Sequence, residues 1–147
     1  MPALPPEPAT GSMIDERYVW FYDDDAFEQV SPGMRRRVVA GDHLSVWFWR
    51  IEDWVGPTAF HVHQQYEQMG FIAAGELEFR IGNGTRQTLG PGSFYLAPVG
   101  VPHGESRFRG DPDRGNEVWI IDVFSPPRVE FADDRGDGNA RAEGGAA

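Results

Sequence analysis

The sequence predicts an all-β domain that closes into a sandwich or barrel. Short runs of β-branched and aromatic residues recur along the chain, and each run is bounded by Gly, Pro, Asn or Asp. Ten such runs fall between residues 18 and 124, whereas no apolar pattern of helical period reaches about a dozen residues. Regularly spaced short strands in one small domain are typical of a two-layered or closed β structure.

The expected strands follow one another with short connections. In chain order they are Tyr18–Tyr22, Arg37–Ala40, Leu44–Ile51, Thr58–His63, Gln68–Ala73, Glu76–Ile81, Gln87–Leu89, Ser93–Ala97, Glu105–Phe108 and Glu117–Phe124. The segment Gly82–Gly84 reads Gly-Asn-Gly, and because these residues tolerate positive φ it is expected to be a hairpin turn. The segment Asp23–Val30 is expected to form one helical turn.

The length of 147 residues suits one domain with a single core. Residues 1–16 are rich in Pro, Ala and Glu, which predicts a flexible N-terminal arm. Residues 132–147 are mostly Asp, Gly, Arg and Ala, which predicts a disordered C-terminal tail. The barrel is therefore expected to occupy residues 17–131.

The composition excludes several kinds of chemistry. The chain has no Cys for thiol nucleophiles, disulfides or zinc–thiolate sites, and all 13 basic residues are Arg, so no Lys can form a Schiff base. The net charge of −10 argues against binding to nucleic acid or to an anionic membrane. The only basic run, Arg35–Arg37, is interpreted as a solvated strand edge. Neither a membrane-spanning stretch nor a signal peptide is visible, so a cytoplasmic location is expected.

Three of the four histidines suggest a metal site. His61 and His63 are one residue apart on an expected strand, and because side chains alternate along a strand, their imidazoles point to the same face. His103 lies further along, in a segment framed by Gly and Pro, whereas His43 lies in a turn and is expected to be solvated. Taken alone, a His-x-His pair is compatible with two structural histidines as well as with metal ligands.

The residues around these histidines resemble the two motifs of the cupin family. The segment from His61 to Gly75 resembles the first motif, and the segment from Gly92 to His103 resembles the second. Arg107 stands where the second motif usually ends in Asn. The resemblance implies a double-stranded β-helix, or jelly-roll barrel, in which the three histidines hold one divalent metal ion inside, facing the barrel mouth. It also implies a homodimer, since such proteins are commonly dimeric.

Two neighbouring residues compete as the fourth metal ligand. Six residues separate Gln68 from Gly75, which is the spacing of the first motif, whereas Glu67 would offer a carboxylate. We favour Gln68 and keep Glu67 as the alternative. Three imidazoles and an amide leave the full 2+ charge on the ion, which favours polarising a carbonyl or hydroxyl over activating dioxygen. Nitrogen and oxygen ligands are compatible with Zn, Ni, Mn or Fe.

A second set of candidate residues lies at the end of the last expected strand. Asp122 is a lone acid in an apolar run, and alternation puts it on the same face as Phe124. It is either an outward-facing or hydrogen-bonded edge acid, or a desolvated acid whose raised pKa suits acid–base catalysis. Two prolines then end the strand and are expected to direct Arg128 back across the barrel mouth.

The His-x-His-x4-Gln pattern and the Asp-x-Phe-x3-Arg ending together resemble the KdgF-like cupins, which act on unsaturated uronates. The resemblance covers roughly residues 33–131. It implies a non-redox reaction in which the metal binds vicinal oxygens and a cyclic unsaturated uronate opens to its linear keto form. The roles it implies are metal ligation by His61, His63, Gln68 and His103, acid–base catalysis by Asp122, and substrate contact by Phe124 and Arg128.

Two departures from the KdgF pattern keep other functions open. Arg109–Asn116 is an enlarged loop before the last strand, and aromatic residues make up 13% of the chain. Most aromatic residues should lie in the core, but several in the cavity would favour a flat substrate, as in cupin polyketide cyclases. An Fe(II)-dependent dioxygenase and a non-catalytic ligand-binding cupin are the remaining alternatives. In each case the expected partner is a small molecule.

Overall fold

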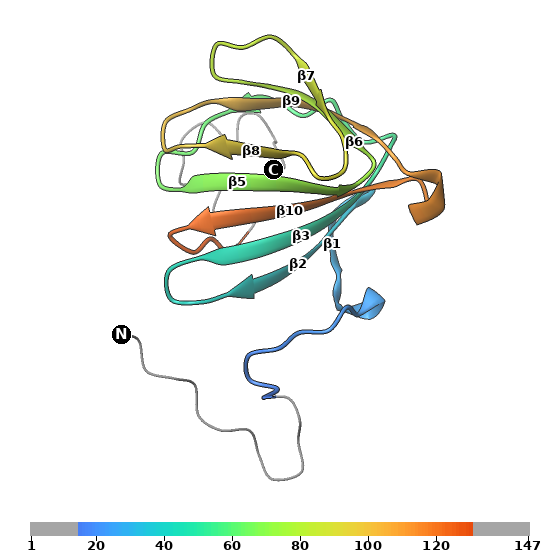
Figure 1. Cartoon of the computed structure of the whole chain (residues 1–147), viewed down its shortest axis with the longest axis vertical. Coiled ribbons are helices and arrows are strands. Elements are labelled where there is room, and N and C mark those ends of the chain that lie inside the picture. The colour runs from blue at the N-terminus through green and yellow to red at the C-terminus, as the bar shows by residue number, and fades with distance from the viewer. Residues whose placement is uncertain (1–14, 131–147) are drawn as a thin grey trace.

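The computed structural model describes residues 15–130, which form ten strands and two short 3₁₀ helices (Figure 1). The strands are β1 (Glu28–Ser31), β2 (Met34–Ala40), β3 (Ser45–Glu52), β4 (Phe60–His61), β5 (Glu67–Ala74), β6 (Glu76–Ile81), β7 (Gln87–Leu89), β8 (Phe94–Ala97), β9 (His103–Arg109) and β10 (Glu117–Ser125). The 3₁₀ helices are η1 (Asp24–Ala26) and η2 (Pro112–Arg114). The expected tail, and all but the last two residues of the expected arm, lie outside the described residues.

The strands form two antiparallel sheets. One has six strands in the order β1-β2-β3-β10-β5-β8, and the other has four in the order β4-β9-β6-β7. In Figure 1, strands β2, β3, β10, β5 and β8 lie side by side, and β9 and β7 lie beyond β8. This is the expected double-stranded β-helix, so the predicted fold class is confirmed. Within residues 15–130 no helix is long and apolar enough to cross a membrane.

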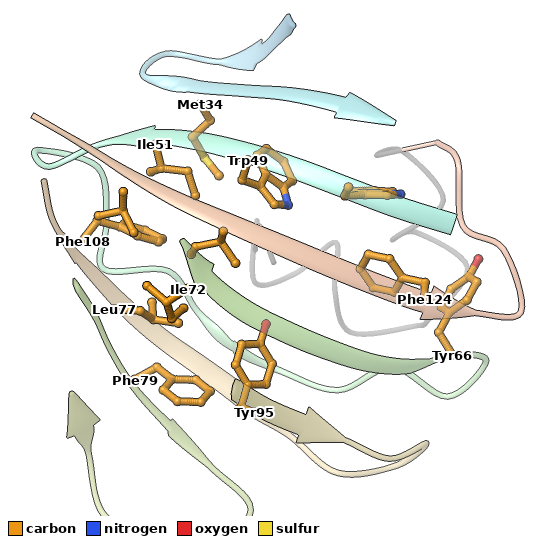
Figure 2. Close-up of a cluster of buried hydrophobic side chains, with 13 residues drawn as sticks. Met34, Trp49, Ile51, Tyr66, Ile72, Leu77, Phe79, Tyr95, Phe108 and Phe124 are labelled. Carbon is orange, nitrogen blue, oxygen red and sulfur yellow. The ribbon is translucent and has the colours of Figure 1, made fainter. Parts of the chain in front are cut away.

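The core lies between the two sheets and follows the two-residue period of the strands. On β3, Trp47, Trp49 and Ile51 are buried and their neighbours are not, and β10 buries every second residue from Val118 to Phe124. Figure 2 shows Trp49 and Ile51 of β3 in one cluster with apolar side chains of β5, β6 and β9. Each large apolar side chain buried there stabilises the fold by about 1.5–3 kcal/mol. The sequence pattern therefore sets which face of each strand turns inward.

The segment before β1 differs from the expectation. Tyr18–Tyr22 is not a strand, and its side chains are exposed, with Trp20 at 54%. The segment instead contacts the outer face of the six-stranded sheet, where the ring of Tyr22 stacks on Trp119 at a centroid distance of 5.8 Å. The predicted strand is wrong, because among residues 15–130 no strand pairs with this segment.

The residues that follow also form less helix than expected. Only Asp24–Ala26 is helical, as a 3₁₀ turn capped by the Asp23 side chain, which accepts a hydrogen bond from the backbone N–H of Asp25. The chain then enters β1, which pairs with β2. The expected helical turn over Asp23–Val30 is therefore correct for its first half alone.

The basic run Arg35–Arg37 lies inside β2, and its interpretation as solvated is wrong for Arg36. Alternation along β2 turns Arg36 inward, where it is 5% exposed. Its guanidinium carbon lies 4.2 Å from the centre of the Trp47 ring, and its head group pairs with Glu28 at 3.0 Å. The run therefore contributes one cation to the barrel interior.

Glu117 ties β10 to β2 and β3. The side chain is buried, and its carboxylate accepts hydrogen bonds from Arg35 and Arg50, each at 2.9 Å. Burial raises the pKa of Glu117, but these two hydrogen bonds, a third from the Trp119 indole and the charge of Arg50 outweigh burial and hold the pKa below its ordinary value of 4.5. Because the folded-state pKa is the lower one, the carboxylate contributes stability above about pH 4.5 that is lost as the pH falls through the folded-state pKa.

We expect Glu117→Gln to lower the free energy of unfolding at neutral pH by about 2–3 kcal/mol, because the hydrogen bonds it weakens are made to charged groups. Denaturant unfolding of parent and variant at neutral pH and at about pH 3 measures the effect, and the difference should shrink in acid. Exposed Glu130→Gln is the matched control. Equal stability of parent and Glu117→Gln at neutral pH would contradict this role.

Candidate metal centre

Three histidines converge inside the barrel. His61 ends β4, His63 follows two residues later, and His103 begins β9 directly opposite His61 in the sheet. All three are buried, at 1–3% exposure, and one ring nitrogen of each lies within 4.8 Å of the others. His43 is exposed, as expected. Strand β4 is shorter than predicted, yet the alternation that turns both His61 and His63 inward persists past its end.

Backbone carbonyls lie where they can hold two of the imidazoles in the tautomer that suits cation binding. Nδ1 of His61 lies 3.2 Å from the carbonyl oxygen of Ala59, and Nδ1 of His103 lies 3.4 Å from that of Val101. Donation of each Nδ1 proton to a backbone carbonyl leaves Nε2 with a free lone pair. Burial, helped by repulsion from nearby cationic groups, lowers the pKa values of His63 and His103 to about 3. Neutral imidazole is the form that binds metal ions.

Gln68 adds an oxygen atom from the opposite sheet. Its side chain is fully buried, and Oε1 lies 3.2 Å from Nε2 of His103. With the His103 proton on Nδ1, two acceptor atoms face each other at this distance, which suits a cation shared between them. Glu67 is exposed, because neighbouring side chains of β5 point to opposite faces. The buried donors therefore fit a divalent metal ion held by three imidazoles and an amide oxygen.

Asp122 lies on the inner face of β10 and has no exposed surface. Its Oδ1 accepts a hydrogen bond from the Tyr95 hydroxyl at 3.1 Å, and its Oδ2 has no hydrogen-bond partner of normal geometry among residues 15–130. Burial raises the pKa of Asp122 to about 7, although hydrogen bonds from Tyr95 and Gln68 oppose the rise. The interpretation as an outward-facing acid is therefore wrong. A carboxyl group that titrates near neutrality can both take and give a proton.

Phe124 and Arg128 lie beside His63. The ring centroids of Phe124 and His63 are 6.0 Å apart, and the guanidinium carbon of Arg128 lies 5.0 Å from the centre of the Phe124 ring and 4.6 Å from that of Trp47. The backbone N–H of Arg128 donates to Ser45 Oγ, and its carbonyl accepts from the Trp47 indole. These bonds fold the chain back after β10, so that Arg128 is 1% exposed.

The structure adds two buried side chains to the candidate site, Tyr95 and Trp49, which the sequence pattern identifies only as core residues. Tyr95 of β8 hydrogen-bonds both Gln68 and Asp122, and a hydrogen bond from the side chain of Trp49 lowers the pKa of Asp122. Alternation predicts that Tyr95 and Trp49 are buried, but their place beside Asp122 depends on cross-strand register. Arg107, the departure from the second motif, is exposed on β9 and lies outside the barrel.

Comparisons with known proteins agree with this fold. Residues 52–112 match the cupin domain family. The chain is 28% identical over 115 residues to the pectin degradation protein KdgF of Dickeya dadantii strain 3937. The aligned residues cover 76% of this chain and 96% of that protein. The chain is also 38% identical over 63 residues to H2HPP isomerase of Bacillus subtilis. Here the aligned residues cover 43% of this chain and 24% of that protein. The structure of KdgF from Halomonas sp. matches with a TM-score of 0.62 at 23% identity, over 75% of this chain and 96% of that one.

These matches and the two antiparallel sheets identify the fold as the double-stranded β-helix of the cupins, and residues 52–112 resemble the cupin domain family. The chain resembles the KdgF-like proteins, both in sequence over most of its length and in fold. The matched family segment contains all three buried histidines and Gln68, whereas Asp122 and Arg128 lie beyond it. The segment that resembles the cupin family therefore carries every candidate metal ligand.

Proposed function

We propose that this chain is a metal-dependent cupin enzyme that catalyses a non-redox step on a small, oxygen-rich substrate. The step is an isomerisation, ring opening, elimination or cyclisation, and a cyclic unsaturated uronate is the first candidate substrate. One observation carries the proposal. A fully buried carboxyl group, Asp122, is connected by hydrogen bonds through the Tyr95 hydroxyl to the amide of Gln68, whose oxygen lies 3.2 Å from Nε2 of buried His103.

The proposed ligands of one divalent ion, Zn, Ni, Mn or Fe, are His61, His63, His103 and Gln68. When bound, the ion supplies Lewis acidity toward a substrate oxygen. None of the four side chains brings negative charge, and the alternative Glu67 is exposed. A neutral set of donors favours polarising an oxygen over oxidative chemistry, because a carboxylate ligand would help to stabilise a higher oxidation state.

Asp122 is the proposed proton shuttle. When a cyclic 4,5-unsaturated uronate opens, the Asp122 carboxylate takes the proton of the anomeric hydroxyl while the C–O bond to the ring oxygen breaks, which leaves an aldehyde and an enolate. The protonated carboxyl then gives its proton to the enolate carbon, and the enolate becomes a ketone. One proton is taken and one is returned, and no electrons are gained or lost. The step therefore needs no oxidant.

Arg128 and Phe124 are the proposed substrate contacts. The Arg128 guanidinium lies inside the barrel near His63, against the Phe124 ring. A guanidinium matches the two oxygens of a carboxylate, so we assign it to the carboxylate of a uronate. The Phe124 ring then offers an apolar face to the substrate ring.

The relatives support the same class of reaction. One is a pectin degradation protein and another is an isomerase, and neither name implies an oxidative step. Pectin is a polymer of uronates, which is why a uronate is the first substrate to test. The cytoplasmic location and the homodimer remain predictions that accompany this proposal.

A substrate screen tests the proposed function. Protein loaded with Zn²⁺ is incubated with cyclic 4,5-unsaturated uronates and, separately, with poly-β-keto compounds. For the uronates, the loss of ultraviolet absorbance of the conjugated double bond is followed. We expect turnover of at least one uronate. Turnover of poly-β-keto compounds alone would identify a polyketide cyclase, and tight uronate binding without turnover would identify a binding protein.

A further inference from the structure

One row of residues crosses the six-stranded sheet beside the candidate metal centre. Trp47 of β3 is paired with Asp122 of β10, Asp122 with Gly70 of β5, and Gly70 with Tyr95 of β8. All four are buried and lie on the inner face of the sheet. The register therefore sets Asp122 and Tyr95 on either side of a residue that has no side chain.

Gly70 leaves the space that Tyr95 occupies. A Cβ atom on Gly70 would lie 2.1 Å from Cε1 and 2.5 Å from Cζ of the Tyr95 ring, which is closer than atoms approach. A glycine inside a strand often marks such a close approach. The Tyr95 ring thus lies directly over β5, and Figure 2 shows its hydroxyl pointing from β8 across that strand. The position of the Tyr95 ring therefore depends on the absence of a side chain at Gly70.

The Tyr95 hydroxyl makes two different hydrogen bonds. It donates to Oδ1 of Asp122 at 3.1 Å, and it accepts from Nε2 of Gln68 at 2.8 Å. The amide of Gln68 has a donor end and an acceptor end, so fixing the donor end directs the acceptor end. Its Oε1 accordingly faces Nε2 of His103 at 3.2 Å. A phenylalanine at position 95 would fill the same space and hold neither group.

We propose that Tyr95 is the positioning residue that orients the Gln68 amide oxygen toward the metal and links that ligand to Asp122. The inference rests on the proposed function, because it takes Gln68 as a metal ligand. Tyr95 acts through its two hydrogen-bond partners. Without its hydroxyl, the amide can rotate and present NH₂, which is no ligand, toward the histidines.

A double-mutant cycle on the full-length protein tests this role. Co²⁺ affinity and the visible spectrum of bound Co²⁺ are measured for the parent, Tyr95→Phe, Gln68→Ala and the double variant. Loss of a hydrogen bond to a metal ligand weakens metal binding by about 10–100-fold, and we expect this from Tyr95→Phe. The Co²⁺ spectrum should shift toward that of Gln68→Ala. In the Gln68→Ala background, Tyr95→Phe should have no further effect.

Two further variants sharpen the test. Tyr66→Phe removes the hydroxyl of an equally buried tyrosine near His63, and any effect on Co²⁺ affinity should be the same in both backgrounds. Gly70→Ala displaces the Tyr95 ring while keeping its hydroxyl, and should reproduce the spectral shift. This variant also serves if Tyr95→Phe fails to fold.

The outcomes separate the inference from the proposed function. An equal loss of affinity from Tyr95→Phe in both backgrounds would overturn the positioning role. The positioning role would also be overturned if Tyr95→Phe bound Co²⁺ as tightly as the parent while Gln68→Ala bound it more weakly. In that case the proposed ligand set would still stand. Parent-like Co²⁺ binding by Gln68→Ala would instead show that the ligand assignment is wrong, and the inference would fail with it.

Discussion

Asp122→Asn should nearly abolish turnover while the protein stays folded and metal-loaded. The amide has the size of the carboxyl group and can still accept the Tyr95 hydrogen bond, but it cannot carry a proton between substrate atoms. General acid–base catalysis contributes about 10²–10⁴-fold to a rate, so kcat/KM on the confirmed substrate should fall by about that factor. Steady-state kinetics and elemental analysis of the same preparation measure both properties.

The control for this variant is Asp53→Asn, which changes an exposed aspartate and should leave the rate unchanged. Thermal unfolding should show that Asp122→Asn is at least as stable as the parent, because the substitution removes a carboxyl group that is buried at a free-energy cost. Full activity of Asp122→Asn would show that the acid–base role is wrong.

His63→Ala should remove the metal. The side chain is 3% exposed and packs against the other two histidines, so its loss leaves both a cavity and an incomplete set of donors. Loss of a hydrogen bond to a metal ligand lowers metal affinity by about 10–100-fold, and loss of the ligand itself should lower it further. Metal content after dialysis and competition with a chelator measure the affinity.

The matched control is His43→Ala, because His43 is the one histidine that lies in an exposed turn. This variant should retain the metal content of the parent. If His63→Ala bound metal as tightly as the parent and His43→Ala did, the three buried histidines would not be the metal centre.

The sequence predicts the parts of the site that depend on local periodicity. His61 and His63 share a face because strand side chains alternate, and the same rule places Gln68 inside and Glu67 outside. Alternation also puts Asp122 on the same face as Phe124, but the structure was needed to show that this face is the inner one. The fold class follows equally well, since strand and turn residues alternate along most of the chain.

Features set by long-range pairing are those that the sequence leaves undetermined. The contact between Tyr95 and Asp122 depends on the register of three strands, and the space for it depends on Gly70. The inward direction of Arg36 can be predicted only if Arg36 is known to belong to β2. The expected strand began at Arg37, one residue too late to include it. The Tyr18–Tyr22 segment has strand-like composition, yet it pairs with no strand among residues 15–130, and strand propensity depends on such tertiary context.

The most direct test of non-redox chemistry at this neutral site is turnover by metal-free protein reloaded with either Zn²⁺ or Fe²⁺, measured with and without oxygen. Zn²⁺ cannot change its oxidation state, so a Lewis-acid mechanism runs with it and a dioxygenase mechanism does not. We predict that the Zn²⁺ protein converts the uronate at the same rate in air and under anaerobic conditions, with no oxygen uptake. Activity with Fe²⁺ alone, with oxygen consumed in step with product, would contradict this and identify a dioxygenase.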